Sequence, residues 1–259
     1  MGEKIYRSEK DTLNVEGREN MTCIIGARGK DGIALISDRL VVRGDEINYG
    51  DKIHVFWEEN PVVVVAFSGF TGIRDKFGPA FISGMREARM QTLGEVISGV
   101  EDIAKYFHER YSPRLGEGVI FMALVSGLTN LANGKAQLHT LFQQGFAGEV
   151  HEFNCIGSAG PYATSFLKMI YEEDMPLERL VAVGGFIIRV IEGSGIDRNV
   201  GGGVDAIIIR DNKGIEMIEK KRINELIQNI SKEDAFSMVS KAFKDLISKS
   251  LFKEEREGK

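Results

Sequence analysis

Short apolar runs bounded by turn residues alternate along the chain with longer stretches in which apolar residues recur every three or four positions. The short runs predict β-strands, and Gly29-Lys-Asp-Gly32 between the first two is typical of a hairpin turn. The turn Gly44-Asp45 predicts a second ribbon, and Val62–Phe67 reads as a fully buried strand. The expected strands are 22–28, 33–37, 41–43, 53–56, 62–67, 118–126, 136–143, 149–156, 203–210 and 215–218.

The longer stretches predict five helices. Two cover roughly 72–88 and 93–111, and proline opens two more at Gly160-Pro161 and Pro176. Ser231-Lys-Glu-Asp234 is a capping box that predicts a last amphipathic helix from about residue 231. Strands, a helix pair, strands, a helix pair, a hairpin and a helix favour an α+β fold. We expect two face-to-face sheets with a helix pair on each outer side, formed by one domain over 22–259.

Composition narrows the classes of function. The 259 residues are 43% hydrophobic and carry a net charge of −5, so no basic surface for nucleic acid is expected. No apolar run approaches the length of a membrane span, and residues 1–20 lack the apolar core of a secretion signal, which predicts a cytoplasmic protein. The two cysteines and four scattered histidines show no metal-ligand spacing. We therefore expect no metal and no cofactor.

Three stretches of the chain resemble the β-type subunits of the proteasome, which are N-terminal-nucleophile hydrolases. The first runs from Thr22-Cys-Ile-Ile-Gly-Ala-Arg to Ile-Ser-Asp38-Arg39, and the second is Ala66-Phe-Ser-Gly69-Phe-Thr-Gly72. The third combines Ile156-Gly-Ser158-Ala-Gly-Pro-Tyr with Asp197-Arg-Asn-Val-Gly-Gly-Gly203-Val-Asp205. The piece around Ser158 is also similar to the peptidase ring of the bacterial two-component ATP-dependent protease. The resemblance extends from Thr22 to about Ile218.

The resemblance implies a four-layer αββα sandwich of two antiparallel sheets and a threonine endopeptidase that cleaves polypeptides. The implied partners are other ring-forming copies or proteasome-type subunits and an ATP-dependent unfoldase. The implied catalytic residues are Thr22, Asp38, Lys52, Gly69, Ser158 and Asp197, and the implied substrate-binding residues are Val41, Val42 and Phe67.

Elementary chemistry supports these roles. A threonine hydroxyl needs a base beside it, and a free α-amino group with a pKa of about 8 can be that base if Thr22 is the first residue. A Lys52 ammonium favours the neutral amine by repulsion, and Asp38 keeps that ammonium charged. Gly69 leaves room for a substrate carbonyl at its N–H. Residues 1–21 are accordingly expected to be a leader or extension.

Two positions depart from the family pattern. Met21 precedes the threonine where processed members usually carry glycine, and Val200 occupies a position where a serine usually completes the polar cluster. Valine forms no side-chain hydrogen bond, which predicts weakened or specialised activity. Two alternatives therefore stay open: a catalytically inactive structural or assembly subunit with an unprocessed N-terminus, or an amidase or acyl-transferase acting on another amide.

Overall fold

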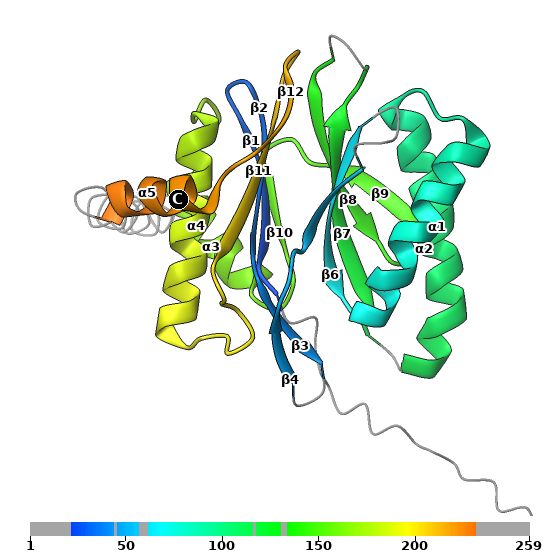
Figure 1. Ribbon diagram of the computed structural model, residues 1–259, viewed down its shortest axis with the longest axis horizontal. Helices are drawn as coiled ribbons and strands as arrows, with labels where there is room; N and C mark the ends of the chain where they lie inside the picture. The colour runs from blue at the N-terminus through cyan, green and yellow to red at the C-terminus, as the bar shows by residue number, and fades with distance from the viewer. Residues whose placement is uncertain (1–21, 44–45, 57–61, 116–117, 131–133, 232–259) are drawn as a thin grey trace, which may run out of the picture.

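The computed structural model describes residues 22–43, 46–56, 62–115, 118–130 and 134–231. It forms four layers, with helices outside two stacked antiparallel sheets (Figure 1). The predicted α+β sandwich is therefore confirmed. None of the helices in these ranges is long and apolar enough to cross a membrane.

The first sheet has the strand order β10-β1-β2-β11-β12 and the second β5-β6-β7-β8-β9, while β3 and β4 form a separate ribbon. The strands of the first sheet are β1 (Ile24–Gly29), β2 (Gly32–Asp38), β10 (Phe153–Ile156), β11 (Val204–Arg210) and β12 (Gly214–Met217). The second sheet and the ribbon comprise β3 (Leu40–Arg43), β4 (Glu46–Tyr49), β5 (Ile53–Phe56), β6 (Val63–Gly69), β7 (Phe121–Leu128), β8 (Ala136–Phe142) and β9 (Phe146–Glu149).

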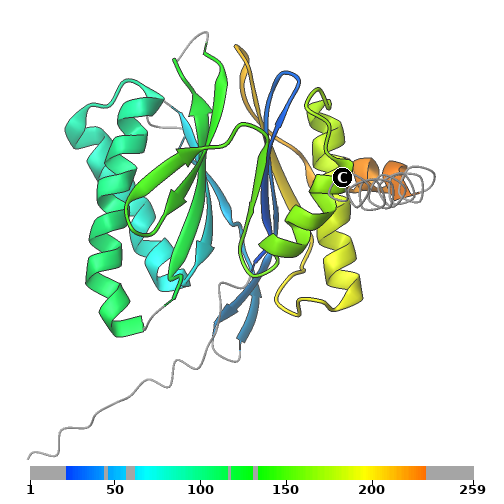
Figure 2. The same ribbon diagram turned by 180° about the vertical axis from the view of Figure 1, so that it is seen from behind.

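Helices cover the two outer faces of the sandwich. α1 (Thr71–Ala88) and α2 (Leu93–Leu115) lie on the second sheet, and α3 (Gly160–Ile170) and α4 (Leu177–Ser194) lie on the first, as Figure 2 shows from behind. α5 (Lys220–Ser231) packs on α4. The β3–β4 ribbon projects from one end of the sandwich, at the bottom of Figure 1.

The side-chain alternation of the central strands creates three apolar layers. Ile25 and Ile36 face α3 and α4, whereas Ile24 and Leu35 face the second sheet. A third cluster, with Phe77 at its centre, fills the space between the second sheet and α1 and α2. β1 and β2 are therefore buried on both faces.

Three sequence predictions need correction. The single strand expected over 149–156 is two strands in different sheets, because the Val150 N–H still bonds the Leu138 carbonyl while the Glu152 carbonyl already accepts from Arg28. The ribbon partner of residues 41–43 is β4 rather than 53–56, which instead pairs with β6. A helix over Lys220–Ser231 was not predicted. The helix expected from about residue 231 and the leader at 1–21 lie outside the described residues.

Candidate active site

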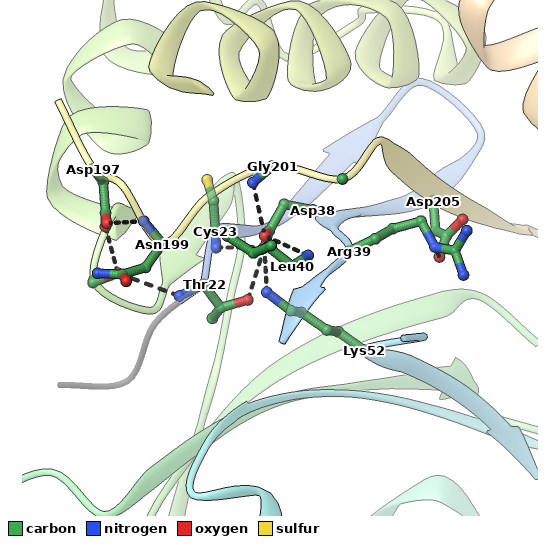
Figure 3. A network of polar contacts seen from close by, with 12 residues as sticks. Thr22, Cys23, Asp38, Arg39, Leu40, Lys52, Asp197, Asn199, Gly201 and Asp205 are labelled. Carbon is green, nitrogen blue, oxygen red and sulfur yellow. Dashed lines mark hydrogen bonds and ion pairs between the residues drawn. The ribbon is translucent and has the colours of Figure 1, made fainter. Parts of the chain in front are cut away.

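Asp38 lies at the centre of the site, at the end of β2 where that strand passes between β1 and β11. Its side chain is fully buried, and Figure 3 shows donors converging on it from several segments. Oδ2 accepts from the backbone N–H groups of Leu40 at 3.1 Å and Gly201 at 3.2 Å. Oδ1 accepts from the N–H of Cys23 at 2.9 Å. These backbone donors satisfy lone pairs of a carboxylate that has no contact with water.

Two side chains predicted to be catalytic donate to the same oxygen of Asp38. The Thr22 hydroxyl donates to Oδ1 at 2.8 Å, and the Lys52 ammonium donates to Oδ1 at 2.6 Å. Thr22 and Lys52 are only 2% and 4% exposed. Asp38 therefore orients the candidate nucleophile and a cation together, away from bulk water.

Opposing effects act on the charge of Lys52. Burial lowers the pKa of Lys52 below its ordinary value, and the Asp38 carboxylate raises it again by attraction and by hydrogen bonding. Arg74 contributes a smaller lowering. Lys52 directly precedes β5, and its carbonyl accepts from the N–H of Phe67 at 2.9 Å. The second sheet thus carries the cation, while the first sheet carries its carboxylate partner.

The nitrogen of Thr22 has a separate polar connection. It donates to Ser158 Oγ at 3.2 Å, and the Ser158 hydroxyl in turn donates to Asp197 Oδ2 at 2.5 Å. Asp197 is itself fixed, because its Oδ1 accepts from the N–H of Asn199 at 2.9 Å. Since the Ser158 proton is directed to Asp197, the Ser158 oxygen presents a lone pair to the Thr22 nitrogen.

The backbone of Thr22 is seated against the turn that precedes α3. The Thr22 carbonyl accepts from the N–H of Ala159 at 3.2 Å. Gly157 has φ +97°, and a Cβ at that position would lie 2.2 Å from the Thr22 carbonyl oxygen and 2.4 Å from its Cγ2. Only glycine permits this approach. Gly157 is a site residue that the sequence prediction missed.

Gly69 ends β6 with φ +143°. Amide directions alternate along a strand, and the N–H of Phe67 points toward β5, where Lys52 accepts it. The N–H of Gly69, two residues later, therefore points to the same side of β6. β5 begins at Ile53 and pairs there with Ala66, so this N–H lies beyond the end of the paired strand. The N–H of Gly69 therefore points to the side of β6 on which Lys52 lies.

A cavity of about 260 Å³ lies between the second sheet and α1. Its lining residues are His54, Phe56, Val65, Phe67, Arg74, Asp75, Phe77, Gly78, Pro79 and Ile82. His54 lies on β5, two positions after Lys52. Burial, followed by the positive Arg74, lowers the pKa of His54 and favours neutral imidazole. Of the three predicted substrate-binding residues, Phe67 lines this cavity, whereas Val41 and Val42, on β3, do not.

A second pair of charges runs beside the first. Asp38 and Lys52 form an ion pair, and their chain neighbours Arg39 and Asp51 form another at 3.0 Å. The Nε atom of Arg39 also lies 2.9 Å from Oδ2 of Asp205. The sequence prediction did not include Arg39, Asp51 or Asp205 in the site, because each one alone is ordinary for a surface turn.

Other groups near the site have different surroundings. Cys23 is fully buried, and desolvation raises the pKa of its thiol well above its ordinary value, which disfavours a thiolate nucleophile. Val200 is 4% exposed and packs in the apolar cluster between the first sheet and α3 and α4. Across the described ranges, no group of three or more histidine, cysteine or acidic residues could hold a metal ion.

Comparison with known proteins decides the family. A model of the proteasome subunit family matches residues 19–209. The chain belongs to this family. Among curated protein sequences, none matches the chain.

Solved structures of Anbu proteins share the proteasome-type fold of this subunit. Anbu (ancestral beta-subunit) from Yersinia bercovieri has a TM-score of 0.67 at 16% identity, over 82% of this chain and 94% of that one. An Anbu Gly-1 mutant from Hyphomicrobium sp. strain MC1 has the same TM-score and identity, over 83% of this chain and 97% of that one. At this identity the similarity establishes the fold, while the roles of individual residues in this proteasome-family chain stay predictions.

Proposed function

We propose that the protein is a threonine-type endopeptidase subunit of a self-compartmentalised, proteasome-like assembly. One observation carries this proposal: the hydroxyl and the nitrogen of Thr22 are held by two different buried or nearly buried carboxylates. Asp38 binds the hydroxyl directly, and Asp197 reaches the nitrogen through Ser158. A threonine that only packs in a strand needs neither connection.

The base in this mechanism is the α-amino group of Thr22 after removal of the preceding residues. The Ser158 oxygen accepts one N–H of that amine, which leaves the nitrogen lone pair available for the hydroxyl proton. Lys52 repels the protonated form of the amine and attracts the oxygen as negative charge develops on it. Asp38 is a poor alternative base, because its Oδ1 already accepts from an ammonium and an amide N–H.

The reaction then follows from the position of Thr22. Its oxygen attacks a peptide carbonyl, the carbonyl oxygen becomes an oxyanion, and the N–H of Gly69 donates to it. The amine returns the proton to the leaving nitrogen, which leaves an ester between Thr22 and the acyl half of the substrate. Water, deprotonated by the same amine, hydrolyses this ester.

The cavity beside Lys52 supports a preference for apolar side chains before the cut bond. Phe67 and Phe77 line it, and the neutral His54 adds no formal charge. The two charged lining residues, Arg74 and Asp75, pair with each other at 3.1 Å between Nη2 and Oδ1. We place the substrate side chain here rather than beside Val41 and Val42. We also infer that the protein works as a ring of identical or related subunits, fed by an ATP-dependent unfoldase.

The state of the N-terminus tests the proposal. In the chain of 259 residues the Thr22 nitrogen is an amide and has no basic lone pair. We suggest production of the full chain and of a chain that begins at Met21, from which a methionine aminopeptidase can expose Thr22. Intact mass and N-terminal sequencing then report the first residue, and a peptide vinyl sulfone reports the reactivity of Thr22.

The expected result is labelling and peptide hydrolysis only when Thr22 is the first residue, with both absent in Thr22→Ala. Labelling without hydrolysis of any peptide in a varied panel would instead favour the amidase or acyl-transferase alternative. A native assembly that retains residues ahead of Thr22 and resists the probe would indicate the inactive subunit. Peptide hydrolysis that persists in Thr22→Ala would refute the mechanism.

A further inference from the structure

The buried amide of Gln143 binds the chain segment that packs against Gly69. Gln143 directly follows β8 and is 5% exposed. Its Oε1 accepts from the N–H of Ile120 at 2.5 Å and from that of Phe121 at 3.4 Å. Its Nε2 donates to the carbonyl of Gly118 at 2.8 Å. The contacted residues run from Gly118 to Phe121, which is the first residue of β7, and β7 lies between β8 and β6.

The orientation of this amide is determined by its partners. Two N–H donors face Oε1 and one carbonyl faces Nε2, so a flipped amide would direct donors at donors. A glutamine is therefore suited to this position, whereas an apolar residue of the same length would leave the Ile120 N–H without its acceptor.

The segment bound by Gln143, residues 118–121, packs directly against the backbone of Gly69. The Ile120 carbonyl accepts from the N–H of Phe70 at 3.1 Å. A Cβ on Gly69 would lie 2.5 Å from the Ile120 oxygen and 2.7 Å from the Phe121 Cα, so the backbones touch. Any shift of Ile120 and Phe121 thus moves the peptide on either side of Gly69.

We propose that Gln143 is a positioning residue that fixes the direction of the Gly69 N–H for the oxyanion; this inference rests on the proposed function. An oxyanion donor contributes only when it is aimed within a few tenths of an ångström before the reaction begins. The amide of Gln143 supplies that restraint from two strands away. Its loss lowers kcat, while substrate affinity, which depends on the cavity, changes little.

The test uses two probes of Thr22 that differ in their need for an oxyanion. A peptide boronate forms a tetrahedral adduct with the Thr22 oxygen and places a boron-bound oxygen at the oxyanion position. A peptide vinyl sulfone forms an oxygen–carbon bond instead, and the hydroxyl proton ends on the carbon beside the sulfone, so no carbonyl oxygen gains charge. Both are measured on the assembled protein with Thr22 as its first residue.

Gln143→Met removes all three amide contacts at nearly constant length. Gln143→Glu keeps the two accepting contacts and loses the donor to Gly118, so it serves as the conservative variant and as a second route if the methionine variant fails to fold. Ser126→Ala is the matched control. Ser126 is fully buried on β7 and donates to the Gln137 carbonyl at 2.7 Å, but it pairs with Val64, five residues from Gly69.

We expect Gln143→Met to weaken boronate binding and to lower kcat, each by about tenfold or more, with vinyl sulfone labelling within about twofold of the wild type. Gln143→Glu should fall between the two, and Ser126→Ala should match the wild type with both probes. Equal boronate affinity in the wild type and both Gln143 variants would overturn the positioning role of Gln143 and leave the proposed function standing. The same conclusion would follow if Ser126→Ala lost as much boronate affinity as Gln143→Met. A wild type that neither probe labels would overturn the proposed function and this role with it.

Discussion

The ion pair between Asp38 and Lys52 allows a quantitative test of the site, through the variant Asp38→Asn. An asparagine can place only one accepting oxygen where the carboxylate has two. Whichever way the amide turns, its NH₂ faces N–H donors: Leu40 and Gly201 on one side, Cys23 and the ammonium on the other. Each buried N–H that loses its acceptor costs about 1–3 kcal/mol.

The charge of Lys52 adds to this cost. The pair is 2.6 Å long with side chains 5% and 0% exposed, and removal of one partner from such a pair typically costs about 3–5 kcal/mol. The two costs overlap, because the ammonium can lose its proton and some donors can find water. We therefore expect Asp38→Asn to lower the free energy of unfolding by about 3–5 kcal/mol, a large part of the stability of a typical domain.

A double-mutant cycle isolates the pair. Lys52→Met alone leaves Asp38 with its remaining donors and should cost about 1–3 kcal/mol. The double variant should be at least about 1 kcal/mol more stable than the sum of the single losses predicts, because no unpaired ammonium remains. Denaturant unfolding followed by far-UV circular dichroism, at one protomer concentration, measures all four chains. Additivity within about 0.5 kcal/mol would show that the pair does not hold the site together.

Three further outcomes are expected. Gly157→Ala should abolish labelling of Thr22 by the vinyl sulfone, because its Cβ would overlap the Thr22 backbone. Gly148→Ala, whose Cβ would meet open space, should label normally. Normal labelling of both variants would contradict the close packing of Thr22 against Gly157. The rate of hydrolysis should rise with pH as the amine loses its proton and fall again as Lys52 loses its proton. Because burial lowers the pKa of Lys52, the falling limb should lie below the pH expected for an ordinary lysine. Lys52→Arg should move that limb to higher pH or remove it, and an unchanged profile would be evidence against the role of the ammonium. Val200→Ser should lower the free energy of unfolding by about 1–3 kcal/mol, since Val200 packs in an apolar cluster, and an altered pH profile of hydrolysis would additionally support a position near the polar site.

The local part of the site could be predicted from the sequence. An apolar run that ends in Asp38 is a buried strand with a carboxylate at its end, and the structure places β2 there with Asp38 fully buried. The start of the first strand likewise predicts where Thr22 lies. These inferences need only the period of one strand and its hairpin partner.

The remainder depends on pairings between distant segments, which no local pattern encodes. Ser158 and Asp197 were assigned only through the family resemblance, because their contact with Thr22 requires that β10 pairs with β1. The split between β9 and β10 went unpredicted because no glycine or proline interrupts residues 149–156 where the chain changes sheets. Gln143 gave no signal at all, since a glutamine after a strand is ordinary until its three backbone partners are known.

The anchors of Thr22 show why release of a new N-terminus at this residue would produce a usable amine. Chain termini usually fray, because few contacts oppose their conformational entropy. Thr22, by contrast, is held from its own side chain and from the residue that follows it: Asp38 binds its hydroxyl and the N–H of Cys23, and Ala159 binds its carbonyl. None of these contacts involves the bond between residues 21 and 22. Cleavage of that bond would therefore change the chemistry of the nitrogen, from amide to amine, and leave these contacts in place.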